Sequence, residues 1–230
     1  MLTAPRATAR HFYLAFDPDF QPEESDMRFR LTYEGKLEAN GTAKHKHEIR
    51  KDFHAQLKRL WEVEPNLKNW TFPYDQKTNL PRVSPLRNQV PAWRYLAEQY
   101  SRIGYKFVPV VSAEHSLHVA LDILFLRPDV PGGVLKSGDI DNRLKTLFDA
   151  LKMPQAADEL GGYIAPAAEE DPFYVLLEDD RLISHVGVET DVLLQPTPTA
   201  AGNFLPNDAR LIITATIRPY AVHMQNLHFA

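Results

Sequence analysis

The order of strand-like and helix-like segments limits the folds open to this chain. Apolar residues recur at helical spacing over residues 44–62 and 139–154, which predicts two amphipathic helices. β-Branched and aromatic residues are concentrated in residues 27–37, 105–111, 117–128, 173–194 and 209–220, which predicts strands. This order indicates an α/β or α+β fold in which helices flank a mixed or antiparallel sheet.

The chain is predicted to form a single domain spanning residues 1–230, with two long insertions. Its length and its hydrophobic content of 44% suffice for one sizeable core. Residues 65–90 are rich in proline, asparagine and charge with little periodicity, and the acidic stretch 155–172 separates the second long helix from the strands after it. A short helix is predicted over residues 92–102, ended by Gly104.

Residues 105–111 and 117–128 are expected to form a hairpin of core strands. A polar turn from Ser112 to His115 separates them, and Pro109 within the first run indicates an edge position or a bulge. Residues 173–194 are interpreted as a strand, a tight turn at Asp179-Asp180 and a second strand.

The composition excludes several classes of protein. The chain has no cysteine, which rules out disulfides, a thiolate zinc site and a cysteine nucleophile, and which fits a reducing, cytoplasmic compartment. The N-terminal stretch has no apolar run long enough for a signal-peptide core, and no apolar run anywhere approaches the length of a membrane span, so we expect neither secretion nor membrane insertion. The net charge of −4 argues against a surface that attracts nucleic acid everywhere.

Positive and negative charge are nevertheless segregated along the sequence. Residues 27–60 contain nine lysines and arginines against four acidic residues, whereas residues 158–191 contain ten acidic residues and a single arginine, Arg181. This segregation suits an enzyme that holds a polyanion with one region and gathers divalent cations with another, although charge runs are also typical of solvated faces. The candidate DNA contacts are Lys44, Lys46, Arg50, Lys51 and Lys136.

Two aspartate motifs carry the predicted chemistry. In D-I-D-N, Asp139 and Asp141 are two residues apart at a helix start, where both carboxylates can face one opening and the helix N-terminus favours their ionised state. In E-D-D, Asp179 and Asp180 follow a predicted strand. Mg²⁺ prefers carboxylate oxygens, so the two motifs together could hold it. Each motif alone is also typical of local structure, a helix cap for Asp139 and a turn for the pair.

The complete pattern D-x-D-N-x-x-K-x-x-x-D-A-L, followed by an apolar strand and D-D, resembles the RusA family of Holliday-junction-resolving endonucleases. The matching positions are Asp139, Asp141, Asn142, Lys145, Asp149, Ala150, Leu151, Asp179 and Asp180. The resemblance implies that Asp139, Asp141 and Asp180 bind Mg²⁺, or Mn²⁺ in its place, and that Lys145 is catalytic or contacts phosphate. Asp179, Asn142 and Asp149 are then supporting residues.

The resemblance covers residues 137–188 and, more loosely, the first strand and helix. It implies a homodimeric α/β endonuclease that cleaves branched DNA in recombination and repair. Three features depart from the family pattern: residues 135–138 are Leu-Lys-Ser-Gly where the family often carries arginines, the acidic insertion lengthens the spacing to the Asp pair, and the chain is longer than a minimal member.

These departures leave two further interpretations open. One is a non-catalytic structured-DNA-binding or phage-associated accessory protein that retains the fold. The other is a structural protein in which the aspartates only cap and turn. For Lys145, the ordinary alternative to catalysis is an i,i+4 ion pair with Asp141.

Other polar residues are weaker candidates. His45 and His47 are two residues apart on the predicted helix and do not share a face, so we expect them, with His54, on a solvated or phosphate-contacting basic face and not in a metal cluster. Asp122 is expected to point outward from its strand, with a fourth site carboxylate as the alternative. His185 is expected to be structural or exposed.

Overall fold

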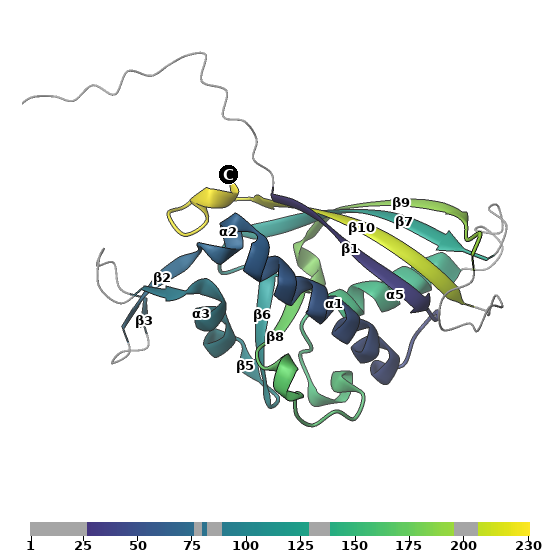
Figure 1. Cartoon of the computed structure of the whole chain (residues 1–230), viewed down its shortest axis with the longest axis horizontal. Coiled ribbons are helices and arrows are strands. Elements are labelled where there is room, and N and C mark those ends of the chain that lie inside the picture. The colour runs from purple at the N-terminus through teal and green to yellow at the C-terminus, as the bar shows by residue number, and fades with distance from the viewer. Residues whose placement is uncertain (1–26, 76–79, 82–88, 129–138, 196–206) are drawn as a thin grey trace, which may run out of the picture.

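The computed structural model describes residues 27–75, 80–81, 89–128, 139–195 and 207–230, which form a mixed α/β fold (Figure 1). Its largest sheet has the strand order β1-β10-β7-β9, made of β1 (Met27–Lys36), β10 (Asp208–Pro219), β7 (Leu117–Arg127) and β9 (Ile183–Val192). Strand β10 is antiparallel to both β1 and β7, whereas β9 is parallel to β7. The prediction of a mixed sheet with flanking helices is therefore confirmed.

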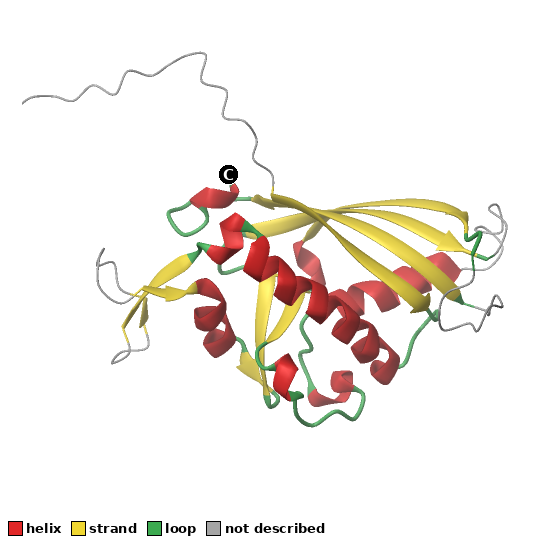
Figure 2. Ribbon diagram, in the orientation of Figure 1, coloured by secondary structure: helices red, strands yellow, loops and turns green. Residues whose placement is uncertain are grey.

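Two long helices cover one face of this sheet, as Figure 2 shows: α1 (Ala43–Val63) and α5 (Asp139–Leu151). Both were predicted from their apolar spacing. Alternate strand residues such as Leu31, Ile123 and Ile213 are buried beneath the helices, and α1 buries Phe53 and Leu57 against them. Among the described residues no helix lies on the opposite face (Figures 1 and 2).

Three further strands form a second, smaller sheet. Strand β6 (Tyr105–Val111) is parallel to β8 (Phe173–Leu177), and β5 (Ser101–Arg102) pairs with the start of β6. Pro109 pairs with Val175 on one side, and β5 reaches only Tyr105 and Lys106 on the other, so the predicted edge position of this proline is confirmed.

The predicted hairpin of residues 105–111 and 117–128 is wrong. Strands β6 and β7 do not pair with each other but belong to different sheets, and β8 and β9 are divided in the same way. The connection from β6 to β7 and the one from β8 to β9 both pass from the small sheet to the large one. A hydrogen bond of 2.9 Å from Glu178 N to Val111 O joins them where they leave the small sheet. A polar break between two apolar runs looks the same in a sequence whether the second strand pairs with the first or enters a second sheet.

The remaining elements lie in or beside the predicted insertions. Residues 65–102 contain α2 (Pro65–Lys68), β2 (Thr71–Asp75), β3 (Leu80–Pro81), β4 (Gln89–Pro91) and α3 (Ala92–Gln99). Residues 155–172 contain the 3-10 turns η1 (Ala157–Leu160) and η2 (Ala168–Glu170), and η5 (Leu227–Phe229) ends the chain. In the described ranges, none of the helices has both the length and the apolar character that crossing a bilayer requires.

Candidate metal-binding and catalytic site

Helix α5 is fixed in place by polar as well as apolar contacts. The buried side of α5 includes Thr146, whose hydroxyl accepts a hydrogen bond of 2.9 Å from Gly41 N in the turn before α1. It also includes Arg143, which is 3% exposed and donates to Asn207 Oδ1 at 2.7 Å. Asp141 and Lys145 lie on the exposed side. The orientation of α5 therefore leaves Asp141 and Lys145 open to solvent.

Asp141 and Lys145 are free to bind a ligand. Neither side chain makes a hydrogen bond or an ion pair with any of the residues that the structure describes, so the alternative of an ion pair between them is not formed. Asn142 accepts a hydrogen bond of 3.2 Å at its main-chain oxygen from the Thr146 hydroxyl. Asp139 is the first residue of α5, but its side chain and Lys136 lie outside the described part of the chain.

The Asp179-Asp180 pair lies where the chain passes from β8 to β9. Asp179 accepts hydrogen bonds from N and Nε of Arg181 at 3.0 and 2.7 Å, and these bonds hold the pKa of Asp179 below its usual value. It thereby caps the 3-10 turn η3 (Asp180–Leu182), which is the local role considered for this motif. Asp180 has a different partner, since its Oδ2 accepts a hydrogen bond of 3.1 Å from Nζ of Lys152, at the end of α5.

Four side chains form what we term the ion-pair chain: Lys46, Asp149, Lys152 and Asp180. Lys46 Nζ lies 2.8 Å from Asp149 Oδ2, and Lys152 Nζ lies 3.0 Å from Asp149 Oδ1 and 3.1 Å from Asp180 Oδ2. Burial alone would raise the pKa of Asp149, but the hydrogen bonds from Lys46 and Lys152 outweigh it and keep the pKa below its usual value. The two cations and two carboxylates alternate, so each charge has an opposite neighbour.

A hollow of about 260 Å³ lies beside the ion-pair chain, lined by Ala43, Lys46, Arg50, Asp149, Lys152 and Glu159. Lys152 was not predicted as a site residue. Its position three residues after Asp149, on the same side of the helix, was the available signal. The contact itself depends on the fold, because Asp180 belongs to a distant segment.

The structure describes the side chains of two of the three predicted metal ligands, Asp141 and Asp180. Within the described ranges, no three His, Asp or Glu side chains lie close enough to hold a metal ion. Asp141 and Asp180 do come from elements in contact, α5 and η3. The third predicted ligand is the carboxylate of Asp139, which lies outside the part of the chain that the structure describes.

The prediction of a solvated basic face on α1 is wrong for three of its residues. His47, Arg50 and His54 are buried, with exposed fractions of 0%, 2% and 4%. Arg50 therefore cannot contact DNA in this structure. These polar side chains have buried partners: Nδ1 of His54, for example, accepts a hydrogen bond of 2.8 Å from Tyr174 N. Helical spacing alone did not show that a second sheet packs on this side of α1.

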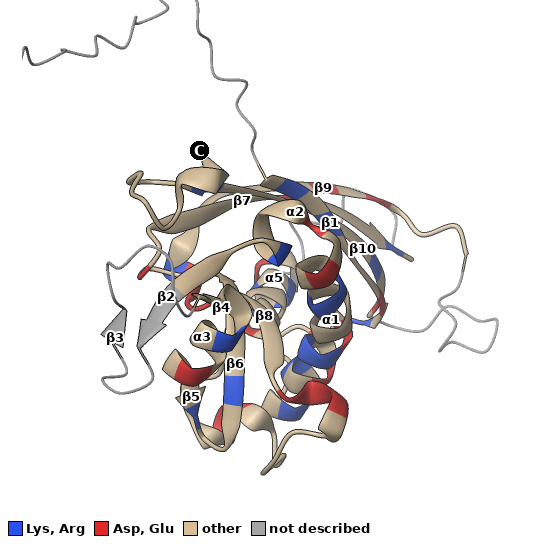
Figure 3. Cartoon of the chain, turned by 60° about the vertical axis from the view of Figure 1, so that its left-hand side comes forward, with Lys and Arg blue, Asp and Glu red and all other residues tan. Residues whose placement is uncertain are grey.

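The acidic segment 155–172 neutralises part of α1, whose charges are visible in Figure 3. Lys51 Nζ lies 2.9 Å from Glu170 Oε1, and Lys58 Nζ donates to Glu169 O at 2.8 Å. Of the predicted DNA contacts that the structure describes, Lys44 alone is exposed; Lys46 and Lys51 already have acidic partners. Among the described residues, the acidic segment thus neutralises Lys51 directly and holds Lys58 through a main-chain oxygen.

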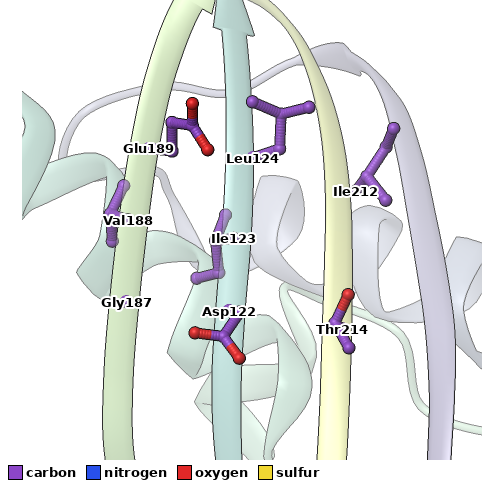
Figure 4. Close-up of a pocket in the computed structure, with 8 residues that line it drawn as sticks. All are labelled: Asp122, Ile123, Leu124, Gly187, Val188, Glu189, Ile212 and Thr214. Carbon is purple, nitrogen blue, oxygen red and sulfur yellow. The ribbon is translucent and has the colours of Figure 1, made fainter.

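A second hollow of about 460 Å³ lies on the sheet face that carries no described helix (Figure 4). Asp122 points outward into it from β7, beside Thr214 of β10 and across from Gly187 of β9. A Cβ on Gly187 would stand 2.6 Å from Asp122 Oδ1, so glycine leaves the room for this carboxylate. Asp122 is therefore outward-facing, as expected, and lies on the opposite face of the sheet from α5. His185 is exposed, with Nε2 3.7 Å from Asp122 Oδ1.

No family model, curated protein or solved structure matches this chain. Its function therefore has to be inferred from its own residues and their arrangement.

Proposed function

We propose that this protein is a Mg²⁺-dependent endodeoxyribonuclease of the RusA type that cleaves branched DNA in recombination and repair. The observation that carries the proposal is the contact of Asp180 with Lys152 at the end of α5. It brings the Asp-Asp pair next to the helix that begins with the D-I-D-N motif, although the two are distant in sequence. Helix α5 thus carries the first motif at its start and contacts the second just after its last residue, and this shared helix supports the proposal.

The chemistry of the available residues fits a hard divalent cation. Mg²⁺ takes carboxylate oxygens and keeps several water molecules, which requires ligands that solvent can reach. Asp141 is exposed, and the side chain of Asp180 is 41% exposed. We propose that these two residues and Asp139 hold Mg²⁺, or Mn²⁺ in its place. When bound, the ion would polarise the scissile phosphate and favour ionisation of a water molecule.

The other residues of the site have proposed roles of their own. Lys145 lies one helical turn after Asp141 with its ammonium unpaired within the described part of the chain, so it can contact the phosphate and offset the charge that develops there. Asp179 fixes the turn that presents Asp180, and Asp149 binds the ammonium of Lys152. Asn142 follows Asp141 in the first turn of α5, where it supports the start of the helix.

We further propose a cytoplasmic homodimer with a RusA-like core, in which residues 65–90 and 155–172 are insertions. A dimer suits a branched substrate, because two symmetry-related sites can act on two strands of one junction. Light scattering coupled to size-exclusion chromatography tests this proposal, since a monomer at working concentration would contradict it.

The test of the activity is cleavage of end-labelled duplex, single-stranded, flap and four-way DNA with Mg²⁺ or EDTA. Asp141→Asn keeps the shape of the side chain but removes its charge, so it is expected to abolish cleavage while DNA binding persists. Asp158→Asn, at an exposed aspartate of the acidic insertion, is the matched control and should cleave normally. Undiminished cleavage by Asp141→Asn would reject the site.

A non-catalytic protein that binds structured DNA is the second candidate function. The ion pair of Asp180 with Lys152 favours it, because the ammonium already contacts one oxygen of a carboxylate that a catalytic metal ion would need. Mg²⁺ binding and tight binding to branched DNA, without cleavage of any substrate, would support this alternative.

A further inference from the structure

Three main-chain contacts hold Lys152 in place. Its N donates to Phe148 O at 3.1 Å, which continues the pattern of α5, and its O accepts from Arg50 Nε at 3.1 Å. It also forms a parallel bridge with Leu177 at the end of β8. The side chain is 19% exposed, so the ammonium has little freedom to leave its partners. Lys152 therefore differs from an ordinary surface lysine.

Lys152 contacts both Asp149 and Asp180, but only Asp149 has a second cationic partner among the described residues. Asp149 lies between two ammonium groups, because Lys46 contacts its Oδ2 and Lys152 its Oδ1. Lys46 thus already offsets the charge of Asp149. For Asp180, Lys152 is the one cationic partner within 4 Å among the described residues. Oδ2 of Asp180, a proposed metal ligand, therefore already contacts the ammonium of Lys152 in the absence of metal.

We propose that Lys152 is a positioning residue and the internal counter-ion of the metal site. It holds the Asp180 carboxylate towards α5 in the metal-free protein and shares it with the divalent cation when that ion binds. This inference rests on the proposed function. Two cations on one carboxylate repel each other, so Lys152 weakens binding of the divalent ion. At the same time it fixes the orientation of Asp180, which favours turnover.

The probe for this competition is Mn²⁺ alone, in the full-length protein without DNA. Free Mn²⁺ is measured from its electron paramagnetic resonance signal during titration of the wild type and of Lys152→Gln, Lys152→Arg and Asp180→Asn. Lys106→Gln is the matched control, because Lys106 is an exposed lysine of β6 with no ion pair among the described residues. Cleavage of four-way DNA at saturating Mg²⁺ is measured in parallel.

Lys152→Gln is expected to bind Mn²⁺ about fivefold more tightly than the wild type, a modest factor because Asp180 is partly exposed to solvent. Its cleavage rate at saturating metal should fall at least about tenfold, because Asp180 loses its fixed orientation. Lys152→Arg should restore wild-type affinity for Mn²⁺, since it keeps the charge. Lys106→Gln should match the wild type in both measurements.

Two results would overturn the inference while leaving the proposed function intact. They are unchanged Mn²⁺ affinity in Lys152→Gln, and weaker affinity in that variant, which would indicate a purely structural role. Failure of the proposed function looks different: the wild type and Asp180→Asn would then bind Mn²⁺ equally or not at all. The two failures are therefore distinguishable in one titration series.

Discussion

Arg50 donates a hydrogen bond of 2.7 Å from Nη2 to the main-chain oxygen of Asp149 in the last turn of α5. Its Nε donates to Lys152 O at 3.1 Å, and its Nη1 lies 3.0 Å from Nδ1 of His47. Burial lowers the pKa of Arg50 to about 10, so the guanidinium still carries its charge at neutral pH. One buried arginine thus satisfies carbonyl groups at the C-terminal end of α5 and ties α1 to the ion-pair chain.

Replacement of Arg50 by methionine is expected to lower the free energy of unfolding by about 3 kcal/mol. Methionine fills much of the space but leaves two partly buried carbonyl oxygens, those of Asp149 and Lys152, without these donors. Urea unfolding followed by circular dichroism measures the loss. Arg59→Met is the control, because Arg59 is 71% exposed and its one ion pair within the described ranges is with Glu62 of the same helix; its cost should stay below about 0.5 kcal/mol. Equal costs would show that Arg50 does not anchor α5.

Gly161 and Gly162 offer a test of how closely the acidic insertion packs on α1. A Cβ on Gly161 would stand 2.2 Å from Cα of Lys44, whereas one on Gly162 would have no neighbour within 4 Å. Both glycines have positive φ, +64° and +95°, so alanine is strained at either position. Gly162→Ala should cost about 1–2 kcal/mol of stability. Gly161→Ala should cost at least about 2 kcal/mol more, because main-chain atoms must move; similar costs would contradict the packing.

The buried histidines predict acid sensitivity. Burial lowers the pKa of His115 to about 4, below the value near 6.5 expected in the unfolded chain. Between these values the unfolded chain takes up a proton that the folded protein does not. The stability is therefore complete above about pH 6.5 and is lost as the pH falls towards 4, by up to on the order of 3 kcal/mol for this residue.

His115→Gln removes this titration, so the slope of stability against pH between 6.5 and 4 should become flatter. Urea unfolding at several pH values gives the slope. A slope that is the same in His115→Gln and the wild type would show that His115 is not the responsible group.

The sequence predicted the individual elements better than their arrangement. The apolar spacing of Ile49, Phe53 and Leu57 identified α1, and the D-I-D-N motif marked the start of α5, because these signals depend on near neighbours. The placement of β6 and β7 in separate sheets depends on contacts with β8 and β9, which no local pattern encodes.

The candidate site was predictable to a similar degree. Residue type and spacing singled out Asp141 and Asp180, whose role as metal ligands stays a prediction. The burial of Arg50 and the contact of Lys152 with Asp180 could not be predicted in this way, because both depend on how α1, α5 and η3 pack together. For the same reason, the pairing of Lys51 with Glu170 could not be predicted from charge runs.

Lys44 is expected to contribute to DNA binding. It is exposed at the start of α1, and it has no acidic partner within the described ranges. Lys44→Ala should weaken binding to all DNA substrates alike and reduce the slope of log affinity against log salt concentration by about 1. Fluorescence anisotropy in EDTA measures both quantities. Lys51→Ala should leave the slope unchanged, because Lys51 pairs with Glu170; the reverse order of effects would contradict this assignment.

The most direct test of the proposed activity is incubation of the purified protein with a labelled four-way junction and with duplex DNA of the same sequence. Each substrate is tested with Mg²⁺ and with EDTA, alongside Asp180→Asn. We predict paired, Mg²⁺-dependent nicks near the branch that are absent from the duplex and from the reactions of the variant. Tight binding to the junction without any nick, or nicks that persist in Asp180→Asn, would contradict the proposed activity.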